Sequence, residues 1–196
     1  MDAGGIGRKR RIIVGVSGAS GVVMARYLLR ALLDYEDVES HLVVSEGAAK
    51  TWQLECAGPL TELTDLADVV HDVHNLAASI SSGSFVTEGM VVVPCSMKTL
   101  SGIATGYADN LITRAVDVCL KEGRHVVLVP REMPLGRVHL RNLKTVSEDG
   151  CAIVPPMLTF YNGPSTLDDQ IWHVVGKVLL QFGLEPRRFR AWEGAE

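Results

Sequence analysis

The sequence lacks the marks of several protein classes. Among its 196 residues, no apolar run approaches the roughly 18 residues that a membrane-spanning helix needs, and no signal-peptide pattern opens it. A formal net charge of −4 does not suit the basic surfaces that bind nucleic acid. The four cysteines show no CxxC spacing, so we expect free thiols in a reducing cytoplasm.

Common catalytic and metal motifs are also missing. The chain shows no nucleophile–His–Asp arrangement, Walker loop or Asp-rich metal motif. His71 and His74 have a spacing that can bind a metal ion, but no third ligand lies near them, so no metal site is predicted. The Gly-rich residues 1–10 are interpreted as a flexible N-terminal leader, followed by a single domain over residues 11–196.

Short apolar runs alternate with amphipathic helical patterns. The runs are rich in Val and Ile and lie at 11–17, 38–45, 90–95, 125–130 and 151–155. Helical patterns lie at about 22–33, 46–56, 99–106, 109–122, 136–148 and 166–182, whereas 59–88 is less regular, with a polar loop at 79–84. This alternation predicts an α/β fold with three αβα layers, a Rossmann- or flavodoxin-like parallel sheet flanked by helices, and a C-terminal helix.

A turn of small residues joins the first strand to the first helix. Gly18-Ala19-Ser20-Gly21 interrupts the apolar pattern at that junction. Glycine lets the backbone approach an anion, and a helix N-terminus supplies unpaired N–H groups and a partial positive charge. The turn therefore predicts a phosphate cradle. The alternative is that its glycines serve only the packing of strand against helix.

Two further strands end in small, polar and charged residues. They continue into Pro94-Cys-Ser-Met-Lys-Thr99 and Pro130-Arg-Glu-Met-Pro134. Ligands of open α/β sheets bind beyond the carboxyl ends of the strands, so these segments and the glycine turn should converge on one edge. Four hydroxyls there either recognise phosphate or cap their helices: those of Ser20, Ser45, Ser96 and Thr99.

Charged and phenolic side chains complete the prediction from the residues alone. Arg131 and Glu132 directly follow a buried strand, so they form either a functional site or a structural ion pair. Arg114 and Lys121 lie seven positions apart on one face of a predicted helix, where they either hold a second phosphate or face solvent. Tyr161 offers a phenol beyond the fifth strand. Together these features predict a phosphate-bearing ligand and go no further.

Seven short segments, taken together, closely resemble the UbiX family of flavin prenyltransferases. The segments are 15–21, 78–84, 94–102, 111–115, 120–122, 129–135 and 155–161, and the resemblance runs from about Arg11 to Trp192. It implies a metal-independent transferase that joins a dimethylallyl group from dimethylallyl phosphate to the N5 and C6 atoms of reduced FMN. The product, prenylated FMN, would serve a UbiD-type decarboxylase. Relatives form large assemblies with flavin sites between subunits, so a homo-oligomer, a dodecamer, is expected.

The resemblance also implies roles for individual residues. The positions matching flavin contacts are Gly18, Ala19, Ser20, Ser45, Ser96, Met97, Lys98, Thr99 and Arg131. The positions matching contacts to the donor phosphate are Arg114, Lys121, Tyr161 and Lys177. Glu132 matches the acid/base residue of the family, and Glu55 matches a further carboxylate near the active site. Ser20 is predicted to take part in catalysis beside them.

The chain departs from the common family pattern in four places. Lys177 stands where Arg is frequent, which keeps the charge but gives up the bidentate fork. Gly123 replaces a frequent Arg, Leu158 a frequent Pro, and Val22-Val23-Met24 a more usual Ala-Ile-Tyr. These departures bear on substrate affinity and pocket shape rather than on the type of reaction.

Two other functions remain as alternatives. One is a flavin-dependent cysteine decarboxylase, but that group carries Asn where this chain has Lys98, and a further Asn where it has Leu158. The other is a non-catalytic FMN-carrier subunit of an aromatic acid decarboxylase. The presence of Lys121, Glu132 and Tyr161 argues against a mere carrier.

Overall fold

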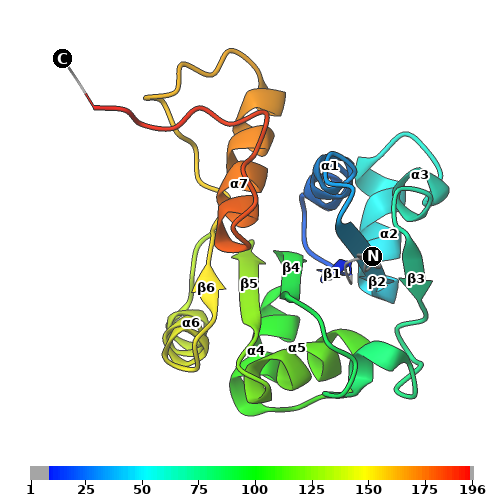
Figure 1. Ribbon diagram of the computed structural model, residues 1–196. Helices are drawn as coiled ribbons and strands as arrows, with labels where there is room; N and C mark the ends of the chain where they lie inside the picture. Colours follow the sequence, from blue (N-terminus) through cyan, green and yellow to red (C-terminus); the bar gives the residue numbers. More distant parts are fainter. Residues whose placement is uncertain (1–8, 195–196) are drawn as a thin grey trace, which may run out of the picture.

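The computed structural model describes residues 9–194. Six parallel strands form one sheet in the order β3-β2-β1-β4-β5-β6 (Figure 1). The strands are β1 (Arg10–Val16), β2 (Val38–Val44), β3 (Val69–His71), β4 (Gly89–Cys95), β5 (His125–Pro130) and β6 (Ala152–Ile153). Of the predicted leader, only Lys9 and Arg10 are described, and Arg10 already opens β1.

Helices cover both faces of the sheet, which confirms the three-layer α/β prediction (Figure 1). They are α1 (Val23–Leu32), α2 (Glu46–Glu55), α3 (Thr61–Thr64), α4 (Met97–Thr105), α5 (Leu111–Lys121), α6 (Arg137–Glu148) and α7 (Leu167–Gln181), with a 3₁₀ turn, η1 (Ser79–Ser81). Successive strand side chains point to opposite faces. Ile12 and Val14 therefore join a core with α1, α2 and α7, whereas Ile13 joins a core with α4 and α5.

The structure corrects the predicted elements in three places. A sixth strand, β3, lies in the stretch that we predicted to be irregular; it is a three-residue edge strand, too short for a clear apolar run. The helix expected from residue 99 begins at Met97, because the Ser96 hydroxyl caps it by accepting the N–H of Thr99 at 3.2 Å. The fifth predicted strand shortens to the two residues of β6.

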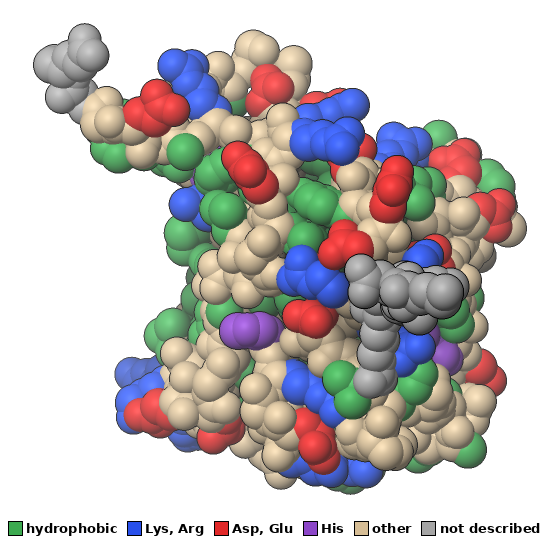
Figure 2. All heavy atoms as spheres, in the orientation of Figure 1, with side chains coloured by type: hydrophobic (Ala, Val, Ile, Leu, Met, Phe, Trp, Pro, Cys, Tyr) green, Lys and Arg blue, Asp and Glu red, His purple; other side chains and the backbone are tan. Residues whose placement is uncertain are grey.

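Charged side chains of both signs are mixed over the face seen in Figure 2. No helix among residues 9–194 is long and apolar enough to cross a membrane. Within the same residues, no group of three or more His, Cys, Asp or Glu side chains is suited to a metal ion. The two histidines with metal-like spacing have other partners: His71 contacts His41, and His74 Nε2 lies 3.1 Å from Glu46 Oε1.

A polar chain links the three strands β1, β2 and β3. The Glu39 carboxylate accepts the Arg11 Nε–H at 2.8 Å and lies 2.9 Å from His41 Nε2. His41 Nδ1 in turn lies 2.9 Å from His71 Nε2. Burial, together with the neighbouring His41, lowers the pKa of His71. A charged His71 ring would be partly buried and would lie against the His41 ring, so the folded state favours neutral His71.

This histidine pair predicts a loss of stability in mild acid. The unfolded chain binds a proton at His71 near its ordinary pKa of about 6.5, whereas the folded chain binds it only at lower pH. The stabilisation is therefore fully present above the unfolded pKa and is lost as the pH falls from there toward the lower folded pKa. Urea unfolding at neutral and mildly acidic pH should show a smaller drop in the free energy of unfolding for His71→Gln than for the unchanged protein. Equal drops in the two proteins would contradict this origin.

Candidate active site

The order of the strands places a crevice at the centre of the sheet. The chain runs from β1 outward to β2 and β3, and then returns to form β4 on the other side of β1. In such sheets ligands bind beyond the carboxyl ends of the strands, where the direction of winding reverses. The glycine turn follows β1, and α2 and α4 begin directly after β2 and β4. The convergence predicted from the sequence is therefore present in the fold.

The glycine turn lies directly against the start of α2. A Cβ atom built on Gly18 would lie 2.9 Å from the backbone of Gly47, a distance at which the backbone would have to shift. Gly21 has φ +91°, a conformation that favours glycine. Its N–H donates to Glu55 Oε2 at 2.8 Å, so the last residue of α2 also holds the turn. The glycines therefore do serve packing, which was the alternative to a phosphate cradle, and this packing also shapes the crevice.

Ser17 is a residue of this site that sequence reasoning missed. Its side chain is 1% exposed. The hydroxyl donates to the Pro94 carbonyl at 2.9 Å and accepts the Ser96 N–H at 2.8 Å. It therefore ties the end of β1 to the end of β4 and to the N-cap of α4. Its place before Gly18 was the only signal, because its partners lie 77 and 79 residues further along the chain.

A cavity of about 630 Å³ opens at this edge of the sheet, a size usual for ligand pockets. It brings together five of the predicted residues: Gly18, Ser45, Ser96, Lys98 and Thr99. The N-termini of α2, α4 and α5 border it, and their caps are Ser45, Ser96 and Asn110. Three helix N-termini and several hydroxyls around one cavity suit an anionic group such as a phosphate.

A second cavity, of about 230 Å³, lies between the start of α1, the end of β5 and the first turns of α7. Ser20 and Arg131 supply its polar rim, and most of its other lining is apolar. Val23, Met24 and Leu158, three of the positions that depart from the family pattern, all line this cavity. Half of the six departing positions therefore lie at this cavity and bear on its shape.

Four of the predicted site residues lie near these cavities without lining them. Glu132 is exposed, and its Oε1 accepts the Met133 N–H at 3.1 Å. Among the described residues, no ion pair joins Glu132 to Arg131. The structural ion pair that we considered as an alternative to a functional site is therefore not formed. Met97 is half-buried and packs against the core. The Ala19 N–H closes the turn on the Ser17 carbonyl, at 2.9 Å, and Glu55 holds Gly21 as described above.

Lys121 and Arg114 lie away from the cavities within one chain. Helix α5 starts at the cavity and runs back along the sheet, so its last residue, Lys121, comes close to the opposite edge, where His125 opens β5. Lys121 Nζ lies 2.7 Å from Glu122 Oε1. Arg114 Nη1 lies 2.6 Å from Asp117 Oδ2. The two cations share a helix face as predicted, but neither lines a cavity at the site edge.

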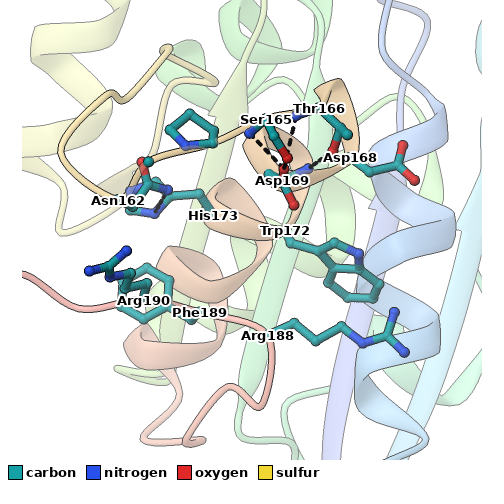
Figure 3. Close-up of a pocket in the computed structure, with 12 residues that line it drawn as sticks. Asn162, Ser165, Thr166, Asp168, Asp169, Trp172, His173, Arg188, Phe189 and Arg190 are labelled. Carbon is teal, nitrogen blue, oxygen red and sulfur yellow. Dashed lines mark hydrogen bonds between the residues drawn. The ribbon is translucent and has the colours of Figure 1, made fainter.

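Tyr161 and Lys177 contact His173 and Phe189, which line a third cavity of about 710 Å³. Figure 3 shows this cavity with its lining residues. Tyr161 Oη lies 3.3 Å from His173 Nε2. The His173 ring stacks on Phe189 with centroids 5.0 Å apart, and Lys177 Nζ lies 5.3 Å from the centroid of the same Phe189 ring. These two predicted donor contacts are therefore close to each other, on a different element from Lys121.

Comparison with known proteins places the chain in a family. The model of the family described as Flavoprotein matches residues 5–175. A probable UbiX-like flavin prenyltransferase of Sedimentibacter hydroxybenzoicus is 59% identical over 186 residues, covering 95% of this chain and 98% of the relative. This chain belongs to the UbiX-like flavin prenyltransferases. The flavin prenyltransferase UbiX of Escherichia coli is 51% identical over 188 residues, covering 95% of this chain and 100% of the relative.

Solved structures of this family match closely. A dodecameric FMN-dependent UbiX-like decarboxylase from Escherichia coli has a TM-score of 0.92 at 53% identity, covering 94% of this chain and 100% of the other. AnUbiX, in complex with FMN and dimethylallyl pyrophosphate, has a TM-score of 0.93 at 44% identity, covering 96% and 100%. The FMN-dependent cysteine decarboxylase SpaF reaches only 0.59 at 22% identity, covering 76% and 85%. That match shows a shared fold alone, whereas the UbiX-like structures cover 94% and 96% of this chain.

Proposed function

We propose that this protein is a flavin prenyltransferase that joins a dimethylallyl group to the N5 and C6 atoms of reduced FMN. The observation that carries the proposal is the match to UbiX-like flavin prenyltransferases over nearly the full chain. The two adjoining cavities at the switch point of the sheet support it. Among donors we favour dimethylallyl phosphate over the pyrophosphate that AnUbiX holds.

The residues of the two cavities fit FMN. The larger cavity, with its three helix N-termini and the hydroxyls of Ser45, Ser96 and Thr99, suits the phosphate of the nucleotide. Gly18 lines this cavity and Ser20 lines the smaller one, so the glycine turn joins the two. We place the flavin ring beside this turn and Arg131. Bound there in its reduced form, FMN supplies the nucleophilic nitrogen and carbon that accept the allyl group.

The proposed donor contacts follow from the charge that the reaction creates. Breaking the allylic C–O bond leaves positive charge on the hydrocarbon and negative charge on the departing phosphate. Preorganised cations and phenolic donors stabilise that anion; in this proposal they are Tyr161, Lys177, Lys121 and Arg114. Glu132 acts as the acid/base residue at the end of β5, with Glu55 as a further carboxylate and Ser20 beside the reacting groups.

The placement of Lys121 and Arg114 bears on assembly. Both lie away from the cavities of their own chain. The relative that is 53% identical is described as dodecameric. We therefore propose a homo-oligomer, a dodecamer, in which these cations reach the site of a neighbouring copy.

The proposal also covers the acceptor of the product, the cellular compartment and the domain organisation. A UbiD-type decarboxylase would accept the prenylated FMN. All four cysteines are free thiols, which supports a reducing compartment such as the cytoplasm. Residues 11–196 would form one flavoprotein domain, in keeping with the single six-stranded sheet of the described residues.

Anaerobic incubation with reduced FMN tests the proposal directly. With dimethylallyl phosphate as donor, mass spectrometry should show the flavin heavier by one five-carbon isoprenyl unit, and a parallel reaction with dimethylallyl pyrophosphate ranks the two donors. Bound but unmodified FMN with an intact donor would favour the carrier subunit instead. Oxidative decarboxylation of a cysteinyl peptide would favour the cysteine decarboxylase.

A further inference from the structure

His173 lies behind the phenol of Tyr161. It is a residue of α7, its side chain is 4% exposed, and its ring stacks on Phe189 at an interplanar angle of 22°. Nε2 lies 3.3 Å from Tyr161 Oη, and Nδ1 lies 3.3 Å from Asn162 Nδ2. Figure 3 shows Asn162, His173 and Phe189 at the wall of the cavity beside α7. Both ring nitrogens of this buried histidine thus have partners.

The neighbours of His173 determine which nitrogen carries its proton. The Thr159 hydroxyl has two acceptors within reach, Asn162 Oδ1 at 3.2 Å and Gln170 Oε1 at 3.4 Å, and we assign its proton to the nearer one. This assignment turns the Asn162 NH₂ group toward His173 Nδ1. An amide NH₂ only donates hydrogen bonds, so Nδ1 must accept and carries no proton. Burial favours the neutral ring and, with the nearby Lys177, lowers the pKa of His173. The neutral ring therefore holds its proton on Nε2, which donates to Tyr161 Oη.

The hydrogen bond from His173 to Tyr161 leaves the phenolic O–H of Tyr161 able to donate elsewhere. Because Tyr161 Oη accepts the hydrogen bond from His173, its own O–H is available to another acceptor. A hydroxyl that accepts one hydrogen bond is polarised and donates more strongly. The Tyr161 side chain is 43% exposed, so a ligand can reach the phenol.

We propose that His173 is a positioning residue that holds the Tyr161 phenol so that its O–H donates to the departing phosphate of the allyl donor. The inference rests on the proposed function, in which Tyr161 and Lys177 contact that phosphate. The phenol proton stays on its oxygen, and the hydrogen bond stabilises the negative charge that develops as the C–O bond breaks. Phe189 contacts both His173 and Lys177: its ring stacks on His173, and Lys177 Nζ lies over the same ring.

Two substitutions at His173 separate hydrogen bonding from packing. His173→Phe keeps an aromatic ring against Phe189 but removes the N–H donor, and His173→Gln keeps an N–H donor on a smaller side chain. Losing one such hydrogen bond in the transition state should lower kcat about tenfold in His173→Phe. The KM for FMN should stay unchanged, and His173→Gln should recover most of the rate. His41→Phe is the matched control, since His41 is equally buried at 3% and lies in β2; its folded fraction should keep the normal kcat.

A double-mutant cycle with Tyr161→Phe decides the case. If His173 acts through the phenol, adding His173→Phe to Tyr161→Phe should cause no further loss of kcat. A full additional loss, or a normal kcat in His173→Phe while Tyr161→Phe is slow, would overturn the positioning role and leave the proposed function intact. An unchanged protein that forms no prenylated flavin would overturn both. Thermal denaturation of each variant confirms that the folded protein is being compared.

Discussion

Glu132→Gln should bind FMN normally and lose nearly all turnover. The substitution keeps the size of the side chain and an oxygen that can accept the Met133 N–H, as the Glu132 carboxylate does among residues 9–194. It removes the ability to take up and release a proton. Because general acid–base catalysis contributes about 10²–10⁴ in rate, we expect at least a hundredfold lower rate of prenylated FMN formation. FMN affinity, measured by the change in flavin fluorescence on binding, should stay within about twofold.

Glu148→Gln is the matched control for that experiment. Glu148 is also an exposed glutamate, but it ends α6 and pairs with Lys144 at 3.0 Å on the helix surface. Such surface pairs contribute about 0–1 kcal/mol to stability, so this variant should keep the normal rate. A Glu132→Gln variant as fast as this control would remove Glu132 from the proton transfer.

Gly18→Ala should weaken FMN binding strongly while the sheet stays folded. The added methyl would lie 2.9 Å from the Gly47 backbone, so either the glycine turn or the first turn of α2 must move. Overpacking of this kind costs about 1–3 kcal/mol, which corresponds to a loss of affinity between about fivefold and about 150-fold if the bound form bears it. Titration with FMN measures the loss, and circular dichroism checks the fold.

Gly136→Ala provides the comparison. A Cβ atom on Gly136 would come no closer than 3.7 Å to its neighbours, which is an ordinary contact. Gly136 lies directly before α6 and lines neither of the two cavities at the sheet edge. Its FMN affinity should match that of the unchanged protein. Equal affinity in Gly18→Ala would mean that the turn does not need its close approach to α2 for binding.

The sequence predicted those features of the fold and the site that depend on residues close together in the chain. Val/Ile runs and helical periodicity identified five of the six strands, because buried parallel strands must be apolar on both faces. The small-residue segments after β1 and β4 identified the crevice, because parallel strands end at one edge. Gly18, Ser45, Ser96, Lys98 and Thr99 were accordingly found together around one cavity.

The features that sequence reasoning missed depend on distant contacts. The burial of Ser17 is decided by Pro94 and Ser96, which no local pattern connects to it. The spacing of Arg114 and Lys121 predicted a shared helix face, but periodicity does not say how far along the sheet each residue comes to lie. The nitrogen of His173 that carries the proton is set by Asn162, whose amide is turned by Thr159. Such chains of contacts become visible only once the fold is known.

The backward run of α5 has a consequence for mixed populations of this protein. In the proposed assembly, a centre draws its carboxylate from one copy and Lys121 from another. A copy damaged at Lys121 would then spoil its neighbour's centre while its own stays sound. Two kinds of defective copy, one altered at Lys121 and the other at Glu132, would regain some working centres when they assemble together, although neither works by itself.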